Sequence, residues 1–376
     1  MVNNRLYRRI YNYGHVSLLY LLIRRNYLAL AKRMSEHIKI DESLLSKSII
    51  KDYKKKWKVL DPFPSTLFFK MYSSLNGEMD LNYIPDYLYR FLVDHILSNF
   101  RYSSYTQHKG LYAFRYPELI DRMPDNLLYK INGVFYDCNY EYINDLEKYL
   151  KGIELSDVVT KESLDTGSGR GIDFFSKDEK NGLYYNKNGA CITNALSAYT
   201  DVLIQKKIEQ SSFMAKFNPT SVNTYRIVTY RSVITEHVHI MQSVLRVGKA
   251  GSPFDNLHAG GNLIAIKKGG VLASHGMDEN GRKIFVGNDI VLPYIDKVHE
   301  LAKTIAEKDK FNRQLFLDIY IDKDEEAKLL EINLTSFPTI QAYCGPAFAE
   351  FTDEVIDYCL KNSGNMVRLI PVDFRR

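Results

Sequence analysis

Apolar residues recur at two different periods along the chain, which predicts both helices and strands. Helical spacing runs through residues 293–308 ("PYIDKVHELAKTIAEK") and 349–362 ("AEFTDEVIDYCLKN"). A further helix is predicted over residues 80–100, where Pro85 fits a first turn and Asn82 is a candidate cap. These segments place helices near both ends of the chain.

Shorter apolar runs between these helices predict strands. Residues 202–210 ("VLIQKKIEQ") and 223–231 ("NTYRIVTYR") begin as β-branched or aromatic runs, and the first one leads into a polar connector. Residues 260–276 ("GGNLIAIKKGGVLASHG") predict two strands joined by a Gly-Gly turn. Helices and strands mixed in this way give the body of the chain α/β character.

Residues 315–333 ("LFLDIYIDKDEEAKLLEIN") place single charges inside runs that otherwise indicate buried strands. The polar turn 322–328 predicts an antiparallel hairpin in which Glu331 and Asn333 share a face and Asp318 lies across from them. Buried carboxylates are costly unless something compensates their charge. Three oxygen-bearing side chains on one face suit Mg²⁺, which binds few carboxylates together with substrate phosphates. The alternative is a pair of ordinary ion pairs on a wetted face.

A glycine-rich loop separates two further predicted strands in residues 157–175 ("DVVTKESLDTGSGRGIDFF"). Glycines let backbone N–H groups approach a phosphate closely, and a lysine at the end of the first strand adds positive charge. The spacing matches neither a P-loop nor a dinucleotide-binding fingerprint, because a strand follows instead of a helix. The candidate phosphate-binding residues are Lys161, Gly167, Ser168, Gly169, Arg170 and Gly171, and an ordinary turn is the alternative.

Composition and charge narrow the class of protein. The chain has 376 residues and four cysteines without metal-binding spacing, which predicts reduced thiols in a cytoplasmic protein. Residues 1–60 hold fourteen Lys or Arg against four Asp or Glu, and the whole chain carries +5. This basic, aromatic-rich start predicts peripheral contact with an anionic membrane surface or polysaccharide, or else a solvated helical face. The apolar run 16–23 is too short to span a bilayer, and nucleic acid is not expected as a partner because no binding motif accompanies the charge.

These motifs follow one another in the order of the ATP-grasp superfamily, which the chain resembles over roughly residues 100–345. The tract 218–231 ("NPTSVNTYRIVTYR") followed by 245–261 ("LRVGKAGSPFDNLHAGG") resembles the sugar-transfer associated ATP-grasp group of bacterial polysaccharide gene clusters. The resemblance implies two α+β subdomains that grip ATP. It divides the chain into a mainly helical region 1–100, a segment 101–210 with the glycine loop and hinge, and a segment 211–376 with the metal site.

The resemblance also implies roles for lysines on the nucleotide side. Lys161 matches the lysine before the glycine loop, and Lys109 in "TQHKGLY" matches the earlier nucleotide lysine. His108 stands where this group usually has an Asp. Lys130 competes with Lys109, although the resemblance places it on an edge strand outside the site.

The remaining assignments by resemblance concern the adenine hinge and the metal ions. Asp318, Glu331 and Asn333 match the magnesium ligands. The hinge corresponds to Gln205, Lys206, Lys207 and Ile208, with Glu209 as a candidate partner of the ribose. Lys206 replaces the usual hinge glutamate, and its expected role is largely through its backbone.

The implied chemistry is that of a Mg-ATP-dependent carboxylate–amine ligase working through an acyl phosphate. Arg226 and Arg246 would neutralise the transferred charge, with surface ion pairs as their alternative. Asn256 and His258 would orient the acyl phosphate or acceptor, and His258 is a candidate base or a structural histidine.

The gene association of this group implies that an amino acid or amine is joined to a sugar carboxylate in cell-surface polysaccharide synthesis. Two other functions stay open. One is an ATP-grasp phosphotransferase acting on a sugar hydroxyl, and the other is a non-catalytic partner docked at the inner face of the membrane.

Overall fold

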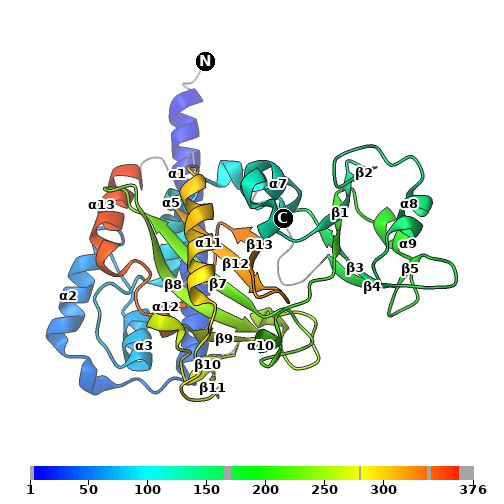
Figure 1. The fold of residues 1–376 in the computed structure, drawn as a ribbon. Helices are drawn as coiled ribbons and strands as arrows, with labels where there is room; N and C mark the ends of the chain where they lie inside the picture. The colour runs from blue at the N-terminus through cyan, green and yellow to red at the C-terminus, as the bar shows by residue number, and fades with distance from the viewer. Residues whose placement is uncertain (1–3, 165–170, 279–280, 337–339, 364–376) are drawn as a thin grey trace.

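The computed structural model describes residues 4–164, 171–278, 281–336 and 340–363. Figure 1 shows a larger β-sheet with helices on both sides and a smaller sheet set apart at one end. The predicted α+β class is therefore confirmed.

The first hundred residues form helices that pack beside the larger sheet (Figure 1). Their elements are α1 (Asn4–Ser35), η1 (Glu42–Leu44), α2 (Lys47–Trp57), α3 (Leu67–Asn76), α4 (Asp86–Leu88), η2 (Tyr89–Val93), α5 (Asp94–Leu97) and η3 (Phe100–Tyr102). The helix predicted over residues 80–100 exists, but it ends at Leu97 and contains η2, a π-helical turn that the sequence pattern did not predict. Asn82 is not its cap, because Pro85 occupies the cap position and the Asn82 N–H donates to Asp80.

Short helical turns lead from this region to the smaller sheet. They are α6 (Ser103–Gln107), η4 (Lys109–Leu111), α7 (Tyr112–Arg115) and η5 (Pro117–Arg122). The smaller sheet has the order β2-β1-β6-β3-β4-β5 with antiparallel neighbours. Its elements are β1 (Asn126–Ile131), β2 (Val134–Asp137), α8 (Leu146–Gly152), β3 (Asp157–Glu162), β4 (Ile172–Lys177), β5 (Tyr184–Asn186), α9 (Ile192–Ser197) and β6 (Val202–Lys206).

The larger sheet has the order β11-β10-β9-β8-β7-β12-β13, and its neighbours are also antiparallel. Its strands are β7 (Thr224–Arg231), β8 (Val238–Val247), β9 (Asn262–Ala265), β10 (His275–Met277), β11 (Lys283–Phe285), β12 (Gln314–Ile321) and β13 (Ala327–Asn333). The helical elements of this part are α10 (Ser212–Ala215), η6 (Leu257–Ala259), η7 (Lys268–Gly270), α11 (Ile295–Lys308), α12 (Gln341–Cys344), η9 (Ala349–Phe351) and α13 (Thr352–Asn362). The predicted hairpin, the strand 223–231 and the helices 293–308 and 349–362 are thus confirmed within a residue or a few.

Alternation along the strands decides which side chains face the site. Ile227 and Leu317 point to the face covered by α11, where they share a hydrophobic core with Val298. Because successive side chains of a strand point to opposite faces, Arg226 and Asp318 project from the other face. That face meets the helices of the first hundred residues.

A second hydrophobic core joins those helices to the larger sheet. It contains Trp57, Tyr72 and Tyr87 from the helical region together with Tyr230 and Phe348 from later in the chain. The smaller sheet has a separate core around Phe175 and Tyr184. The helical region and the larger sheet therefore form one packed body, and the smaller sheet is tethered to it.

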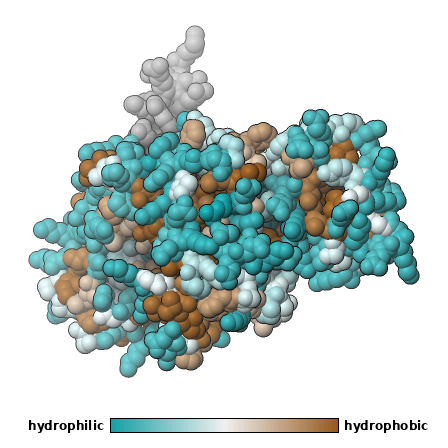
Figure 2. Space-filling model, in the orientation of Figure 1, coloured by the Kyte–Doolittle hydropathy of each residue, from teal (hydrophilic) through white to brown (hydrophobic). Residues whose placement is uncertain are grey.

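The outer surface gives one further fact about the start of the chain. Figure 2 shows a largely hydrophilic face with scattered apolar patches. Leu18, Leu21 and Leu22 of α1 are 54%, 57% and 40% exposed, while Ala31 and Met34 near the other end of the same helix are buried. Among the described residues, no helix combines the length and apolarity that crossing a bilayer requires.

Candidate active site

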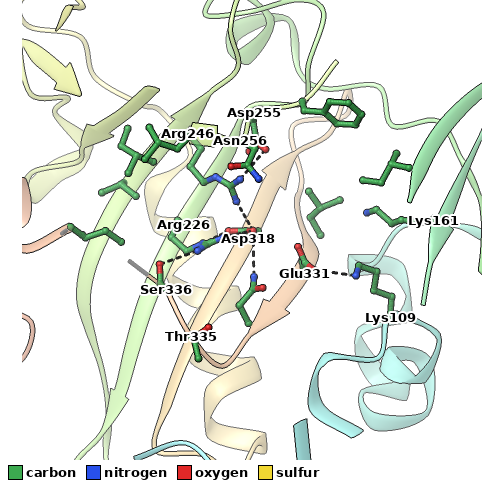
Figure 3. A pocket seen from close by; sticks show the side chains of 18 of the residues that line it. Lys109, Lys161, Arg226, Arg246, Asp255, Asn256, Asp318, Glu331, Thr335 and Ser336 are labelled. Carbon is green, nitrogen blue, oxygen red and sulfur yellow. Dashed lines mark hydrogen bonds and ion pairs between the residues drawn. The ribbon is translucent and has the colours of Figure 1, made fainter. Parts of the chain in front are cut away.

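A cleft of about 370 Å³ opens on the face of the larger sheet opposite α11, and the smaller sheet and the helical region help to line it. Figure 3 shows Arg226, Arg246 and Asp318 converging on one point, with Lys109 and Lys161 on one side and Thr335 and Ser336 on the other. The cleft therefore collects side chains from segments that are far apart in the sequence.

Asp318 is the centre of this cluster. It pairs directly with Glu331 across the β12–β13 hairpin and with Arg226 across the β12–β7 ladder. The Arg226 guanidinium donates to both carboxylate oxygens, with 2.8 Å between Nη2 and Oδ2. Arg246 Nη1 donates to the same Oδ2 at 2.7 Å. Asn333 Nδ2 lies 3.5 Å from that oxygen, so three of the predicted site residues meet at one buried carboxylate.

The surrounding charges set the ionisation of the buried acids. Burial opposes ionisation of Asp318, yet Arg226 and Arg246 outweigh it and lower the pKa of this carboxyl. Asp255 accepts hydrogen bonds from Arg246, at 3.2 Å, and from the Thr224 hydroxyl. Burial nevertheless raises the pKa of Asp255, and the nearby negative charge of Asp318 adds to this shift, whereas Arg246 opposes it. Asp318 is accordingly the more firmly ionised of the two acids.

The two lysines approach from the side of the smaller sheet. Lys109 Nζ lies 3.1 Å from Glu331 Oε1, and the Lys109 backbone N–H donates to the Ser163 carbonyl at 3.0 Å. Lys161 projects from β3, and burial lowers its pKa to about 8, although Glu331 partly opposes that shift. An anionic ligand beside such a lysine stabilises its charged form, because the ligand's negative charge compensates for the solvation that burial removed.

A second pocket of about 320 Å³ adjoins the cleft. The two spaces share Lys161, Ile172, Phe254, Asp255 and Leu330 on their walls. The second pocket is otherwise lined by the predicted hinge, from Gln205 to Glu209, and by apolar side chains such as Val159 and Phe174. An apolar slot beside a polar connector suits a flat heterocycle, and the shared wall places its neighbour, the cleft, where attached phosphates would lie.

The hinge residues have different local partners. Gln205 donates to Asn126 at 2.6 Å, and the Lys206 backbone N–H donates to the Asp125 carbonyl at 3.0 Å. These two contacts hold the end of β6 in place, so hydrogen bonds to a base are expected from later groups of the connector. Lys207 lies 3.8 Å from Asp157 and Glu209 lies 3.7 Å from Lys323, both as partly exposed ion pairs.

Not all of the predicted phosphate- and acceptor-binding residues belong to the described ranges. Gly167, Ser168, Gly169 and Arg170 are outside the described residues, and so is the side chain of His258, whose backbone belongs to η6. Gly171 is described and has a positive φ of 69°, which favours glycine. Asn256 lines the cleft, where Figure 3 shows it beside Asp255.

Lys130 is distant from the cleft, as expected, but its predicted position on an edge strand is wrong. Strand β1 lies between β2 and β6. Lys130 Nζ donates to the carbonyls of Leu196 and Tyr199 at 2.7 and 2.5 Å. These contacts fix the end of α9, and they give Lys130 a structural role within the smaller sheet.

Sequence reasoning missed several residues that line the cleft. Asp255 stands next to Asn256 in "SPFDNLH", so an acid in that motif was a signal that could have been used. Ser336 accepts a hydrogen bond from Arg226 Nη1 at 3.0 Å. Tyr27 of α1 and Arg90 of η2 also line the cleft, and no local motif marked either one.

The residues present fit a magnesium site. Asp318, Glu331 and Asn333 bring two carboxylates and an amide to one face of the hairpin, and their oxygens are hard donors of the kind Mg²⁺ prefers. Guanidinium groups occupy both Asp318 oxygens here, so Mg²⁺ would have to replace some of these contacts. In the described ranges, no group of three or more His, Cys, Asp or Glu side chains forms a metal site. Magnesium here would therefore rely on this mixed set and on phosphate oxygens of a ligand.

Two sheets that enclose an apolar pocket and a lysine- and arginine-lined cleft define a protein of the ATP-grasp class. The sequence model of the sugar-transfer associated ATP-grasp family matches residues 122–347, which is more than half of the chain. The chain belongs to that family.

Comparison with individual proteins adds only distant similarities. No protein of curated function matches the chain. It is similar to the structure of D-alanyl-alanine synthetase A from Vibrio cholerae, with 13% identity, a TM-score of 0.42, and coverage of 68% of this chain and 66% of that one. It is also similar to the structure of N5-carboxyaminoimidazole synthase from Aspergillus clavatus in complex with ADP and 5-aminoimidazole ribonucleotide. The identity is 11%, the TM-score is 0.40, and the match covers 68% of this chain and 54% of that one. The chain thus spans about half to two thirds of the length of these proteins.

Proposed function

We propose that this protein is a Mg-ATP-dependent ligase that joins a carboxylate to an amine through an acyl phosphate. The observation that carries the proposal is the pair of adjoining spaces with a common wall at Lys161 and Asp255. One space suits adenine, and the other collects the charged groups that a triphosphate and its metal ions require. Family membership is consistent with this arrangement.

Each charged group has a task in the proposed reaction. Lys109 and Lys161 bind the phosphates from the side of the smaller sheet, and Asp318, Glu331 and Asn333 would hold the magnesium. When bound, the metal would supply positive charge that neutralises the phosphates. Arg226 and Arg246 would stabilise negative charge on the group in transfer, and their position against Asp318 in the cleft supports this role.

The bond changes follow from that placement. A carboxylate oxygen of the acid attacks the γ-phosphorus, the bond from that phosphorus to the β-phosphate oxygen breaks, and ADP leaves. The amine nitrogen then attacks the acyl carbon, and the carbon–oxygen bond to phosphate breaks. Asn256 would orient the acyl phosphate, and His258 is our candidate to accept the proton that the amine loses.

We further propose that the acid or amine partner is a sugar derivative of cell-surface polysaccharide synthesis. The description of the family as sugar-transfer associated supports this substrate class. We place the enzyme in the cytoplasm, at the inner face of the membrane. Exposed Leu18, Leu21 and Leu22 beside Arg25 on α1 support that location, because such a helix can lie on an anionic surface.

The reaction class is tested by ADP release from Mg-ATP with a matrix of acids and amines. A ligase forms ADP and free phosphate in amounts that depend on both partners. A phosphotransferase instead forms ADP with a hydroxyl-bearing sugar alone and leaves a stable phosphorylated sugar. ADP formation that needs no acid would contradict the ligase, and the acid-plus-amine dependence would exclude the phosphotransferase.

A further inference from the structure

The helical region contributes Tyr27 and Arg90 to the wall of the cleft, and the roles proposed so far use neither residue. We propose that Arg90 and Tyr27 form the subsite that binds the carboxylate of the acid substrate, so that the helical region selects the acid. This inference rests on the ligase function proposed above and names the part of the cleft that its acid occupies.

The position of this pair within the cleft is the first argument. Lys161, Ile172 and Phe254 belong to the wall shared with the adenine pocket, whereas Tyr27, Arg90 and Ser336 line the cleft alone. Figure 3 shows Ser336 on the opposite side of Asp318 from Lys161. Under the proposed function, adenine, the phosphates and Asp318 would therefore follow one another along the two adjoining spaces. The group that attacks the γ-phosphorus would then enter through the part of the cleft that the second pocket does not share, and Tyr27 and Arg90 line only the cleft.

The backbone that carries Arg90 is the second argument. Residues 89–93 form a π-helical turn between two α-helical segments. A π-helical turn inserts an extra residue into a helix and is often found at functional sites. Here the turn falls at the residue that reaches the cleft, while Tyr89 and Leu92 of the same turn pack into the core.

The contacts of Arg90 leave it suited to a ligand. Its Nη1 donates to Asp94 Oδ2 at 2.9 Å, and the Asp94 side chain has no exposed surface. Within the part of the chain that the structure describes, this ion pair uses one edge of the guanidinium, and the fork geometry of arginine offers a second edge to a carboxylate. Burial raises the pKa of Tyr27 to about 12, partly offset by Arg90, so its hydroxyl remains a hydrogen-bond donor.

The charge balance of the cleft is the third argument. Its walls carry five cationic side chains against three carboxylates, namely Arg90, Lys109, Lys161, Arg226 and Arg246 against Asp255, Asp318 and Glu331. The buried Asp94, which pairs with Arg90, leaves a surplus of one positive charge. Magnesium ions neutralise a bound triphosphate, so the surplus of positive charge is not consumed by Mg-ATP. A further anion is needed for balance, and a carboxylate is the anion that the proposed reaction consumes.

The decisive experiment measures acid binding separately from turnover. D-glucuronate, D-galacturonate and D-alanine are titrated by calorimetry into protein saturated with Mg²⁺ and a non-hydrolysable ATP analogue. At least one acid is expected to bind wild type, and Arg90→Gln/Asp94→Asn should weaken it by about tenfold or more, the loss typical of a charge-assisted hydrogen bond. The paired change avoids leaving the buried Asp94 without its cation. Affinity for the ATP analogue should not change.

Three controls make the result specific. Arg90→Lys should recover part of the acid affinity, because it restores the charge without the fork. Arg25→Gln removes an exposed arginine from the helix that carries Tyr27 and should leave the affinities for the acid and for the ATP analogue unchanged. Methyl glucoside, which lacks a carboxylate, should show no dependence on Arg90.

The outcomes separate this subsite from the ligase function. The subsite is wrong if wild type binds none of the acids, or if the double variant binds them as tightly as wild type. If acid binding depends on Arg90 but no acid and amine produce ADP, the subsite holds and the ligase function fails. If ADP forms and the KM for the acid is the same in the double variant as in wild type, the proposed ligase function holds and the proposed subsite is wrong.

Discussion

Replacing Asp318 by asparagine should separate the proposed metal-binding role of the hairpin from its structural role. Asp318 is 2% exposed in its side chain, and both its oxygens accept from guanidinium groups. The amide would turn an N–H group toward one of the two arginines and would leave Arg226 without a negative partner at that position. Breaking a buried ion pair on one side costs about 3–5 kcal/mol, so Asp318→Asn should melt well below wild type without ligand.

Glu331→Gln provides the matched comparison. Glu331 faces Lys109 at 3.1 Å, and its side chain is 26% exposed, so solvent compensates part of the loss. We expect a cost of about 1–2 kcal/mol without ligand, close to the value of one charged hydrogen bond. Asp318→Asn is thus the more destabilising change, although both remove one carboxylate from the proposed metal site.

Thermal melts with and without Mg-ATP are the assay. Wild type should be stabilised by Mg-ATP through mass action, whereas both variants should lose most of that ligand-induced shift. ADP formation should fall to near zero in each. The reasoning is refuted if Glu331→Gln keeps the full shift with Mg-ATP, because its charge would then serve only Lys109. It is also refuted if Asp318→Asn has the same melting temperature as wild type without ligand.

Three further predictions concern the rest of the molecule. Lys161→Met should weaken ATP binding by about 1–3 kcal/mol in calorimetry, and wild-type affinity would remove Lys161 from the phosphate site. The same substitution tests the pH dependence. The pKa of Lys161 is lowered from 10.5 to about 8, so between these pH values the unfolded state binds more protons than the folded state. The free energy of unfolding of wild type, relative to that of Lys161→Met, should therefore rise with pH in this range. Urea unfolding at about pH 7 and about pH 9.5 would show this rise. A difference that stays constant or falls with pH would contradict the buried, poorly solvated state of this lysine. Leu18→Asp/Leu21→Asp should abolish salt-sensitive binding to liposomes with anionic lipid and leave ATP binding intact, and undiminished binding would show that the exposed leucines are not the membrane contact.

The sequence predicted the hairpin well because its pattern is local. Asp318 and Glu331 lie on strands joined by a short polar turn, so strand alternation was enough to place them face to face. Arg226 could be placed near them only through the family resemblance, because its strand pairs with β12 across many residues of intervening chain.

Other parts of the site depend on contacts that no local pattern encodes. Arg90 reaches the cleft through a π-helical turn, whereas a regular 3.6-residue period predicted a plain helix there. Tyr27 lies on a helix whose apolar spacing is consistent with simple packing. Both become part of the cleft only when the helical region packs against the larger sheet, which is a tertiary event.

The core shared by the helical region and the larger sheet has a consequence for attempts to exchange specificity between relatives. Trp57 and Tyr87 bury their rings in the same cluster as Tyr230 and Phe348, so the first hundred residues are not an independent module that can be exchanged alone. In a chimera that takes this region from another family member, the aromatic side chains on the two sides of the core would not fit together. Such a chimera should misfold, so its acid preference could not be measured. To transfer the acid preference of a relative, the helical region would have to be exchanged together with the residues of β7 and β12 that face it. These two parts would therefore change together.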